Sequence, residues 1–132
     1  MIRAHRQAVE ALVPDSLPLY VGKVPQGVTL PERYAVLHFV VGMASATRYD
    51  GDGADWRHWP FVTHAYGKTV DQCQWVQERL DEAFQGVRPQ VAGRSCTRIS
   101  RVGDGIAPEP DTDEIPPIIL ARDSWAFDSI PA

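Results

Sequence analysis

At 132 residues the chain is long enough to bury one hydrophobic core and too short for two, so we expect a single domain over residues 1–132. Its net charge of −4, with no run of lysine or arginine, argues against a basic nucleic-acid-binding face. No stretch approaches the roughly 20 apolar residues that span a bilayer, and no apolar signal segment is visible, so we expect a soluble, unsecreted protein.

The N-terminal third predicts a helix followed by an apolar strand. Apolar side chains and His5 recur on one helical face of residues 2–13, and Pro14 ends the pattern. The short segment 19–21 is β-prone, and the strand over residues 34–41 is apolar almost throughout. Because such a strand needs cover on both faces, we expect a helix on one face, with another subunit as a candidate for the other.

An acidic, glycine-containing loop and a second strand follow. Residues 43–57 include Asp50-Gly51-Asp52-Gly53, which predicts a solvated turn, because such turns need residues that tolerate positive φ. A calcium-binding EF-hand loop would need a glycine at Asp55 and a glutamate at Phe61, so the spacing does not fit. Residues 61–66 predict a strand antiparallel to 34–41, with Pro60 at its start.

The segment 69–86 predicts a capped amphipathic helix. Thr69 and Gln72 form a capping box, and Gly86 occupies the C-terminal cap position. Trp75 lies off the apolar stripe, so it either flanks the core or anchors an interface, and we favour the flank. The stripe, which we expect to pack on the sheet, consists of Val70, Cys73, Val76, Leu80, Ala83 and Phe84.

The C-terminal part predicts three strands and one long loop. The strands cover residues 90–92, 96–102 and 118–127. Residues 103–117 predict a proline-rich acidic loop that contains Glu109, Asp111, Asp113 and Glu114. Together these elements predict an α+β fold with a mixed, mainly antiparallel sheet of four to five strands, two helices packed on one face, and long loops.

Neither a phosphate-binding loop nor a disulfide is favoured. Gly67-Lys68-Thr69 resembles the end of a phosphate-binding loop, but Val62 stands where that loop needs another glycine. The two cysteines, Cys73 and Cys96, could pair, but the missing secretion signal favours free buried thiols.

The histidines leave one alternative open. His58 and His64 would lie about 20 Å apart in an extended strand, so they cannot share a zinc ion unless Pro60 folds the segment back. His38 and His64 could face each other across paired strands, which allows either a metal or acid-base site or a hydrogen-bonded sheet histidine. We predict no metal, no cofactor and no enzymatic activity.

Two tryptophans stand at the junction of the acidic loop and the second strand. Aromatic anchors are common in protein–protein contacts. Trp56 and Trp59 could therefore either take part in an interface or pack locally in the core. The candidate interface residues are Asp50, Asp52, Trp56, Trp59, Trp75, Glu109, Asp111 and Asp113.

The chain resembles the tail terminator (minor tail) proteins of long-tailed bacteriophages. The resemblance rests on the order of elements and on a few segments rather than on a catalytic signature. These are the N-terminal helix, Leu30–Tyr34 leading into a strand that ends at Val41-Gly42, the strand Phe61–Tyr66 with its following helix, the turn Gly103-Asp104-Gly105, and the closing strand through Trp125 and Phe127.

The resemblance implies a structural virion protein that forms a ring, a hexamer, on the completed tail tube, ends tube polymerisation and joins the tail to the neck. Implied partners are other copies of the chain, the major tail tube protein and a neck or connector protein, with no membrane. DNA would pass through the lumen without specific binding, and six copies at −4 each would carry about −24, which repels phosphate.

Two other classes remain open. A head–tail connector or other tail-completion subunit would share nearly all these features. A small cytosolic enzyme or ligand-binding domain would require a pocket that joins His38 and His64, with Cys96 as a further candidate.

Overall fold

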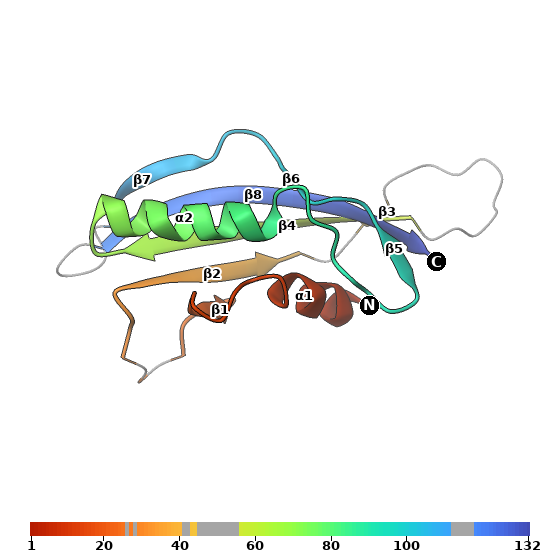
Figure 1. The fold of residues 1–132 in the computed structure, drawn as a ribbon, viewed down its shortest axis with the longest axis horizontal. Helices are drawn as coiled ribbons and strands as arrows, with labels where there is room; N and C mark the ends of the chain where they lie inside the picture. The colour runs from red at the N-terminus through yellow and green to blue at the C-terminus, as the bar shows by residue number, and fades with distance from the viewer. Residues whose placement is uncertain (26, 28, 41–42, 45–55, 112–117) are drawn as a thin grey trace.

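Figure 1 shows the computed structural model of the chain, which describes residues 1–25, 27, 29–40, 43–44, 56–111 and 118–132. Within these residues the chain forms two helices and eight strands of one sheet, and no helix there is long and apolar enough to cross a membrane. The elements are α1 (Ile2–Glu10), β1 (Leu19–Val21), β2 (Arg33–Phe39), β3 (Met43–Ala44), β4 (Arg57–Gly67), α2 (Val70–Phe84), β5 (Arg94–Cys96), β6 (Ser100–Arg101), β7 (Ile106–Asp111) and β8 (Ile118–Pro131).

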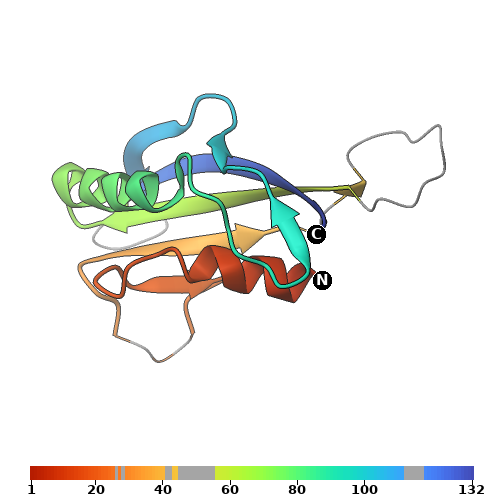
Figure 2. The same ribbon diagram turned by 45° about the vertical axis from the view of Figure 1, so that its right-hand side comes forward.

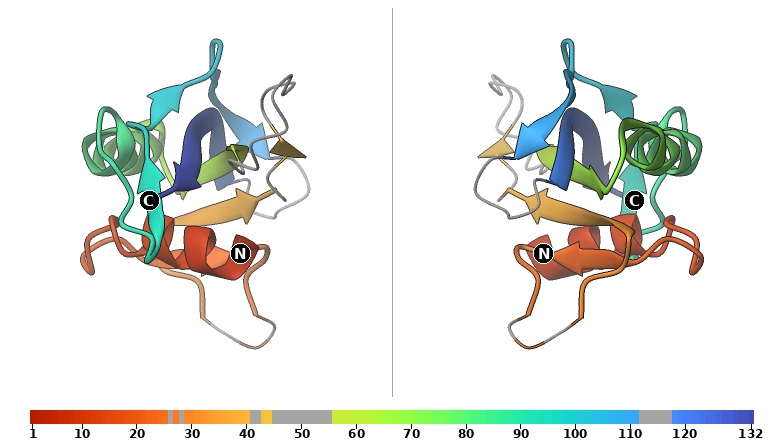
Figure 3. Two further views of the ribbon diagram at one scale, coloured as in Figure 1. Left: turned by 90° about the vertical axis from the view of Figure 1, so that its right-hand side faces the viewer. Right: turned by 90° about the vertical axis from the view of Figure 1, so that its left-hand side faces the viewer.

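The sheet is mainly antiparallel, and β4 pairs with β8 along its whole length. The strand order is β1-β2-β4-β8-β5, with β3 paired to β4 and both β6 and β7 paired to β8. Only β1 and β2 form a parallel pair among the described strands. The α+β class is as predicted, but the sheet is larger than four to five strands because short strands pair outside the main order. Figure 3 shows the sheet curving around the core.

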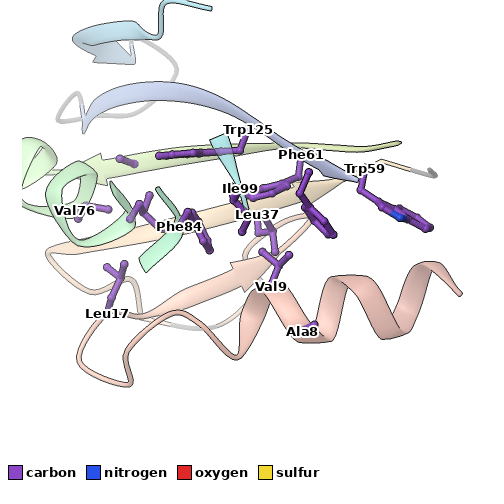
Figure 4. Close-up of a cluster of buried hydrophobic side chains, with 14 of the residues drawn as sticks. Ala8, Val9, Leu17, Leu37, Trp59, Phe61, Val76, Phe84, Ile99 and Trp125 are labelled. Atoms are coloured by element: carbon purple, nitrogen blue, oxygen red, sulfur yellow. The ribbon is translucent and has the colours of Figure 1, made fainter. Parts of the chain in front are cut away.

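Both helices cover the same face of the sheet (Figure 2). The imidazole of His5 in α1 stacks on the Trp59 ring, with centroids 4.0 Å apart. The Phe84 ring of α2 meets the Phe61 ring edge-on at 5.2 Å. Because Trp59 and Phe61 are two residues apart in β4, they point to one face. The core lies between this face and the helices (Figure 4).

Helix α2 begins and ends where the sequence predicts. The backbone N–H of Gln72 donates to the Thr69 hydroxyl at 3.1 Å, and Gly86 follows the last turn with a φ of +75°. Four residues of the predicted stripe are buried, whereas Val70 is exposed in the first turn. The buried four are Cys73, Val76, Leu80 and Phe84.

Gly67 allows α2 to start close against the end of β4. A Cβ at this position would lie 2.5 Å from the backbone nitrogen of Cys73, which is too close for any real contact. The Gly67-Lys68-Thr69 sequence is therefore explained by this close approach and by helix capping.

Helix α1 ends at Glu10, before the predicted boundary at residue 13. Leu12 and Val13 still pack against the core from the turn that follows. The second face of β2 is covered within the chain at Tyr34, which is buried and stacks on the Tyr66 ring at 4.8 Å. Cover by another subunit is therefore not needed at that point.

The strand predicted over residues 61–66 is longer than expected. β4 begins at Arg57, because its first residues pair with both β3 and β8, and Pro60 lies within the strand instead of at its start. Because the strand starts earlier, Trp59 is a residue of β4 and not of the loop before it.

The C-terminal part corrects three predictions. Residues 90–92 are not a strand, and β5 starts at Arg94. The predicted strand 96–102 divides into β5 and β6, because the backbone N–H of Ile99 turns to the carbonyl of Val87 instead of the sheet. The closing strand β8 continues to Pro131, beyond the predicted end at residue 127.

The predicted loop 103–117 contains the strand β7. Pro108 and Pro110 give this segment the composition of a loop, because proline lacks the N–H that a central strand needs. Within the described residues β7 pairs only with β8, and such an edge position tolerates proline.

Candidate functional site

The predicted interface residues that the structure describes do not form one site. Asp50, Asp52 and Asp113 lie outside the described residues. The other five fall in three parts of the fold, at the start of β4, on α2 and on β7. They are Trp56, Trp59, Trp75, Glu109 and Asp111.

Trp59 belongs to the hydrophobic core, which corrects its assignment as an interface candidate. Its side chain is 1% exposed, and its indole N–H donates to the Ser129 hydroxyl oxygen at 3.0 Å. A side chain without exposed surface and with a satisfied N–H cannot anchor a partner. The physical reason is strand alternation, since β4 starts at Arg57 and directs Trp59 to the face that the helices cover.

Trp56 precedes β4 and is 43% exposed. Its indole N–H donates to Asp128 Oδ2 at 3.1 Å, and His58 Nδ1 donates to Asp128 Oδ1 at 2.7 Å. The backbone N–H of Asp128 in turn donates to Thr97 Oγ1 at 2.9 Å. These bonds fix the indole on the surface, and an exposed, oriented tryptophan suits the predicted interface anchor.

Trp56 lines a groove of about 610 Å³ beside the end of β8. Ile130, which is 41% exposed, and the exposed Arg88 and Arg98 also line this groove. Neither arginine forms an ion pair with a carboxylate of the described residues. We name it the Trp56 groove, after Trp56, Arg88, Arg98 and Ile130. Its apolar surface and two positive charges suit an apolar segment that carries acidic residues.

Trp75 lies on the flank of the core, as the sequence predicts. It is partly buried and packs against the core cluster. The guanidinium of Arg33 in β2 lies 3.6 Å from the centre of its ring, and that of Arg79 lies 5.2 Å away. These cation–π contacts link β2 to α2 across the tryptophan.

Glu109 and Asp111 lie on β7 instead of in a loop. The side chain of Glu109 is exposed and stands between two prolines. Glu109 is in register with Leu120 of β8, whereas the Trp56 groove lies beside Ser129 of the same strand. At ~3.3 Å per residue, nine residues of β8 separate the two regions by roughly 30 Å.

His38 and His64 meet across β2 and β4, with ring centroids 4.7 Å apart. Burial, followed by the positive charges that His38 and Arg122 carry when protonated, lowers the pKa of His64 to about 4. Cys96 lines the Trp56 groove and not the pocket beside these histidines. Among the described residues, one pocket therefore joins His38 and His64, and Cys96 lies outside it.

The cysteines are free and buried, as predicted. Burial, together with the Asp123 carboxylate, raises the pKa of Cys73 to about 11, and burial also raises the pKa of Cys96. A protonated thiol is a poor nucleophile and a poor metal ligand. In the part of the chain that the structure describes, no three His, Cys, Asp or Glu side chains gather to hold a metal ion.

Neither a protein-family model nor a curated protein matches this sequence. Solved structures share its fold. One has a TM-score of 0.67 at 18% identity, and the match covers 96% of this chain and 94% of that chain, which bears only an identifier as its name. Another is a chain of a structure described as "Virion of native gene transfer agent (GTA) particle", with a TM-score of 0.61 at 12% identity over 98% and 94%. At these identities the likeness shows the fold alone.

Sequence reasoning missed a buried polar cluster around Ser129. The Ser129 hydroxyl oxygen accepts from Trp59 Nε1 and from Arg94 Nη2, both at 3.0 Å, and lies 2.8 Å from His5 Nε2. His5 Nδ1 donates to the carbonyl of Met1, which leaves Nε2 to accept from the serine. The cluster ties α1 to the sheet, and no local signal could reveal a pair 124 residues apart.

Sequence reasoning also missed the arginines of the Trp56 groove. Arg88 and Arg98 approach Trp56 only because β5 pairs with the end of β8. That pairing is long-range, so neither spacing nor composition could have placed them beside a tryptophan.

Proposed function

We propose that the protein is a structural component of a phage-like virion. The observation that carries this proposal is the shared fold with a chain of the gene transfer agent particle, at a TM-score of 0.61. The match covers 98% of this chain and 94% of that chain, so it concerns the whole subunit and not a common substructure. The protein then works by shape and contact, without catalytic turnover.

Within the virion we propose the role of a tail terminator at the tail–neck junction. The resemblance in sequence pattern to that family supports this position. Copies of the chain form a ring, a hexamer, which caps the tail tube, ends its polymerisation and joins the tail to the neck. Its partners are other copies, the major tail tube protein and a neck or connector protein. The net charge of −4 per copy suits a lumen that DNA crosses without specific binding.

A head–tail connector or another tail-completion subunit is the alternative, because a shared virion fold does not by itself assign a position in the particle. An enzymatic role has less support. His38 and His64 meet, but Cys96 lies in a different groove.

Deleting the gene in the phage-like element that encodes the chain tests the proposal, with electron micrographs of the particles as the readout. Loss of a terminator should leave headless tails of uncontrolled length, and expression of the chain from a plasmid should restore them. Tails of normal length that fail to join heads would favour the connector. Normal, infectious particles would refute a virion role.

A further inference from the structure

The Trp56 groove presents an apolar surface beside two exposed cations. The Trp56 indole is held by its hydrogen bond to Asp128, and Arg98 Nη1 donates to the carbonyl of Gly86 at 3.1 Å. Both of these side chains, which line the groove, therefore have fixed positions. Tryptophan and arginine are among the residue types enriched at the centres of protein interfaces. The groove therefore has the composition of a docking site.

The strand β7 carries the complementary chemistry. Its residues include Ile106, which is 40% exposed, two prolines, and the acidic residues Glu109 and Asp111. Proline rings pack on aromatic side chains, which is how aromatic-lined grooves recognise proline-rich segments. Carboxylates pair with arginine guanidinium groups. Glu109 forms no ion pair with a cation of the described residues, so it remains available.

The groove and β7 cannot meet within one copy. They lie at opposite ends of β8, roughly 30 Å apart along the strand at ~3.3 Å per residue, and Figure 1 shows β7 at one end of the sheet and β5 at the other. A contact between them must therefore join two copies. Because the two surfaces differ, the contact is head-to-tail, and contacts of this kind close into rings when the rotation permits.

We propose that the Trp56 groove of one copy binds the Pro108–Asp111 segment of β7 in the next copy. The prolines pack on Trp56 and Ile130, and Glu109 faces Arg88 and Arg98. The missing N–H groups at the prolines limit pairing with a further strand, so the contact runs through side chains. This contact rests on the ring of the proposed function and specifies which surfaces build it.

A pair of charge-reversed variants tests the contact. One carries Arg88→Glu and Arg98→Glu in the groove, and the other carries Glu109→Lys and Asp111→Lys on β7. A control with Arg3→Glu and Lys23→Glu changes the charge of the chain as much as the groove variant, at exposed sites outside both surfaces. Circular dichroism verifies that each variant folds, and light scattering after size exclusion measures the assembled mass.

Wild type and control should assemble, whereas each charge-reversed variant alone should self-associate at least about tenfold more weakly, because like charges then meet across the contact. An equal mixture of the two variants should assemble again, since each groove then finds a segment of opposite charge. A folded mixture that stays dissociated, or a wild-type chain that is monomeric at its highest soluble concentration, would overturn the contact. If the variants assemble in this pattern but deletion of the gene leaves normal particles, the virion role is refuted and the contact stands.

Discussion

Replacing Leu80 with alanine should destabilise the subunit far more than replacing Trp56 with alanine. Leu80 is fully buried on the stripe of α2 that faces the sheet, in the same cluster as Phe84. Truncating a buried leucine costs about 2 to 5 kcal/mol, because the lost transfer free energy adds to the cost of the cavity.

The expected change in melting temperature follows from the length of the chain. An unfolding entropy of about 2.1 cal/mol/K per residue gives about 3.6 °C per kcal/mol for 132 residues, so Leu80→Ala should lower the Tm by roughly 7 to 18 °C. Trp56→Ala removes a half-exposed ring and one hydrogen bond to Asp128, which keeps its bond to His58. We expect a cost of about 1 kcal/mol and a Tm change of about 4 °C.

Thermal unfolding followed by circular dichroism, at a concentration where the chain is monomeric, measures both effects. Val102→Ala is a suitable control, since Val102 is 51% exposed and its truncation should be nearly neutral. If Trp56→Ala lowered the Tm as much as Leu80→Ala, the tryptophan would be part of the folded core and its assignment to an interface would be wrong.

Lowering the pH should destabilise the folded chain, because burial lowers the pKa of His5 and brings that of His64 down to about 4 from 6.5. The neutral histidines contribute fully to the free energy of unfolding above pH 6.5, and this contribution is lost as the pH falls from 6.5 toward 4. Urea unfolding across that range measures the loss, and a free energy of unfolding that increased on acidification would contradict it. Cys73 and Cys96 should react with a thiol reagent only after unfolding, since both are buried and protonated, and rapid labelling in native buffer would count against this. Gly67→Ala should cost about 1 to 3 kcal/mol in denaturant unfolding, because the new Cβ would overlap the backbone of α2, and a neutral result would mean that the helix can shift.

The elements that the sequence predicted well are those with local causes. Helix α2 has its cap, its apolar stripe and its terminal glycine within one continuous segment, so its boundaries could be predicted to within a residue or two. The pairing of β2 with β4 is also close in sequence, and most residues of β2 are apolar.

The elements that were missed depend on distant partners. Once β4 is known to start at Arg57, alternation separates the buried Trp59 from the exposed Trp56, but that start depends on pairing with β3 and β8. The composition of β7 predicts a loop because its prolines are acceptable only at an edge, and edge position is a property of the whole sheet. The Trp56 groove has the same origin, since it forms where β5 meets β8.

The position of β8 constrains how the chain acquires its structure during synthesis. In the sequence this strand follows all the other described strands, yet in space it lies between β4 and β5. Until residues 118–131 have left the ribosome, β4 has an unpaired side and the core lacks Trp125 and Phe127, both of which are buried. Such long-range pairing makes folding late and cooperative. A message that stops before β8 therefore yields a chain without a closed core, which is a substrate for degradation instead of a defective subunit that enters the assembly.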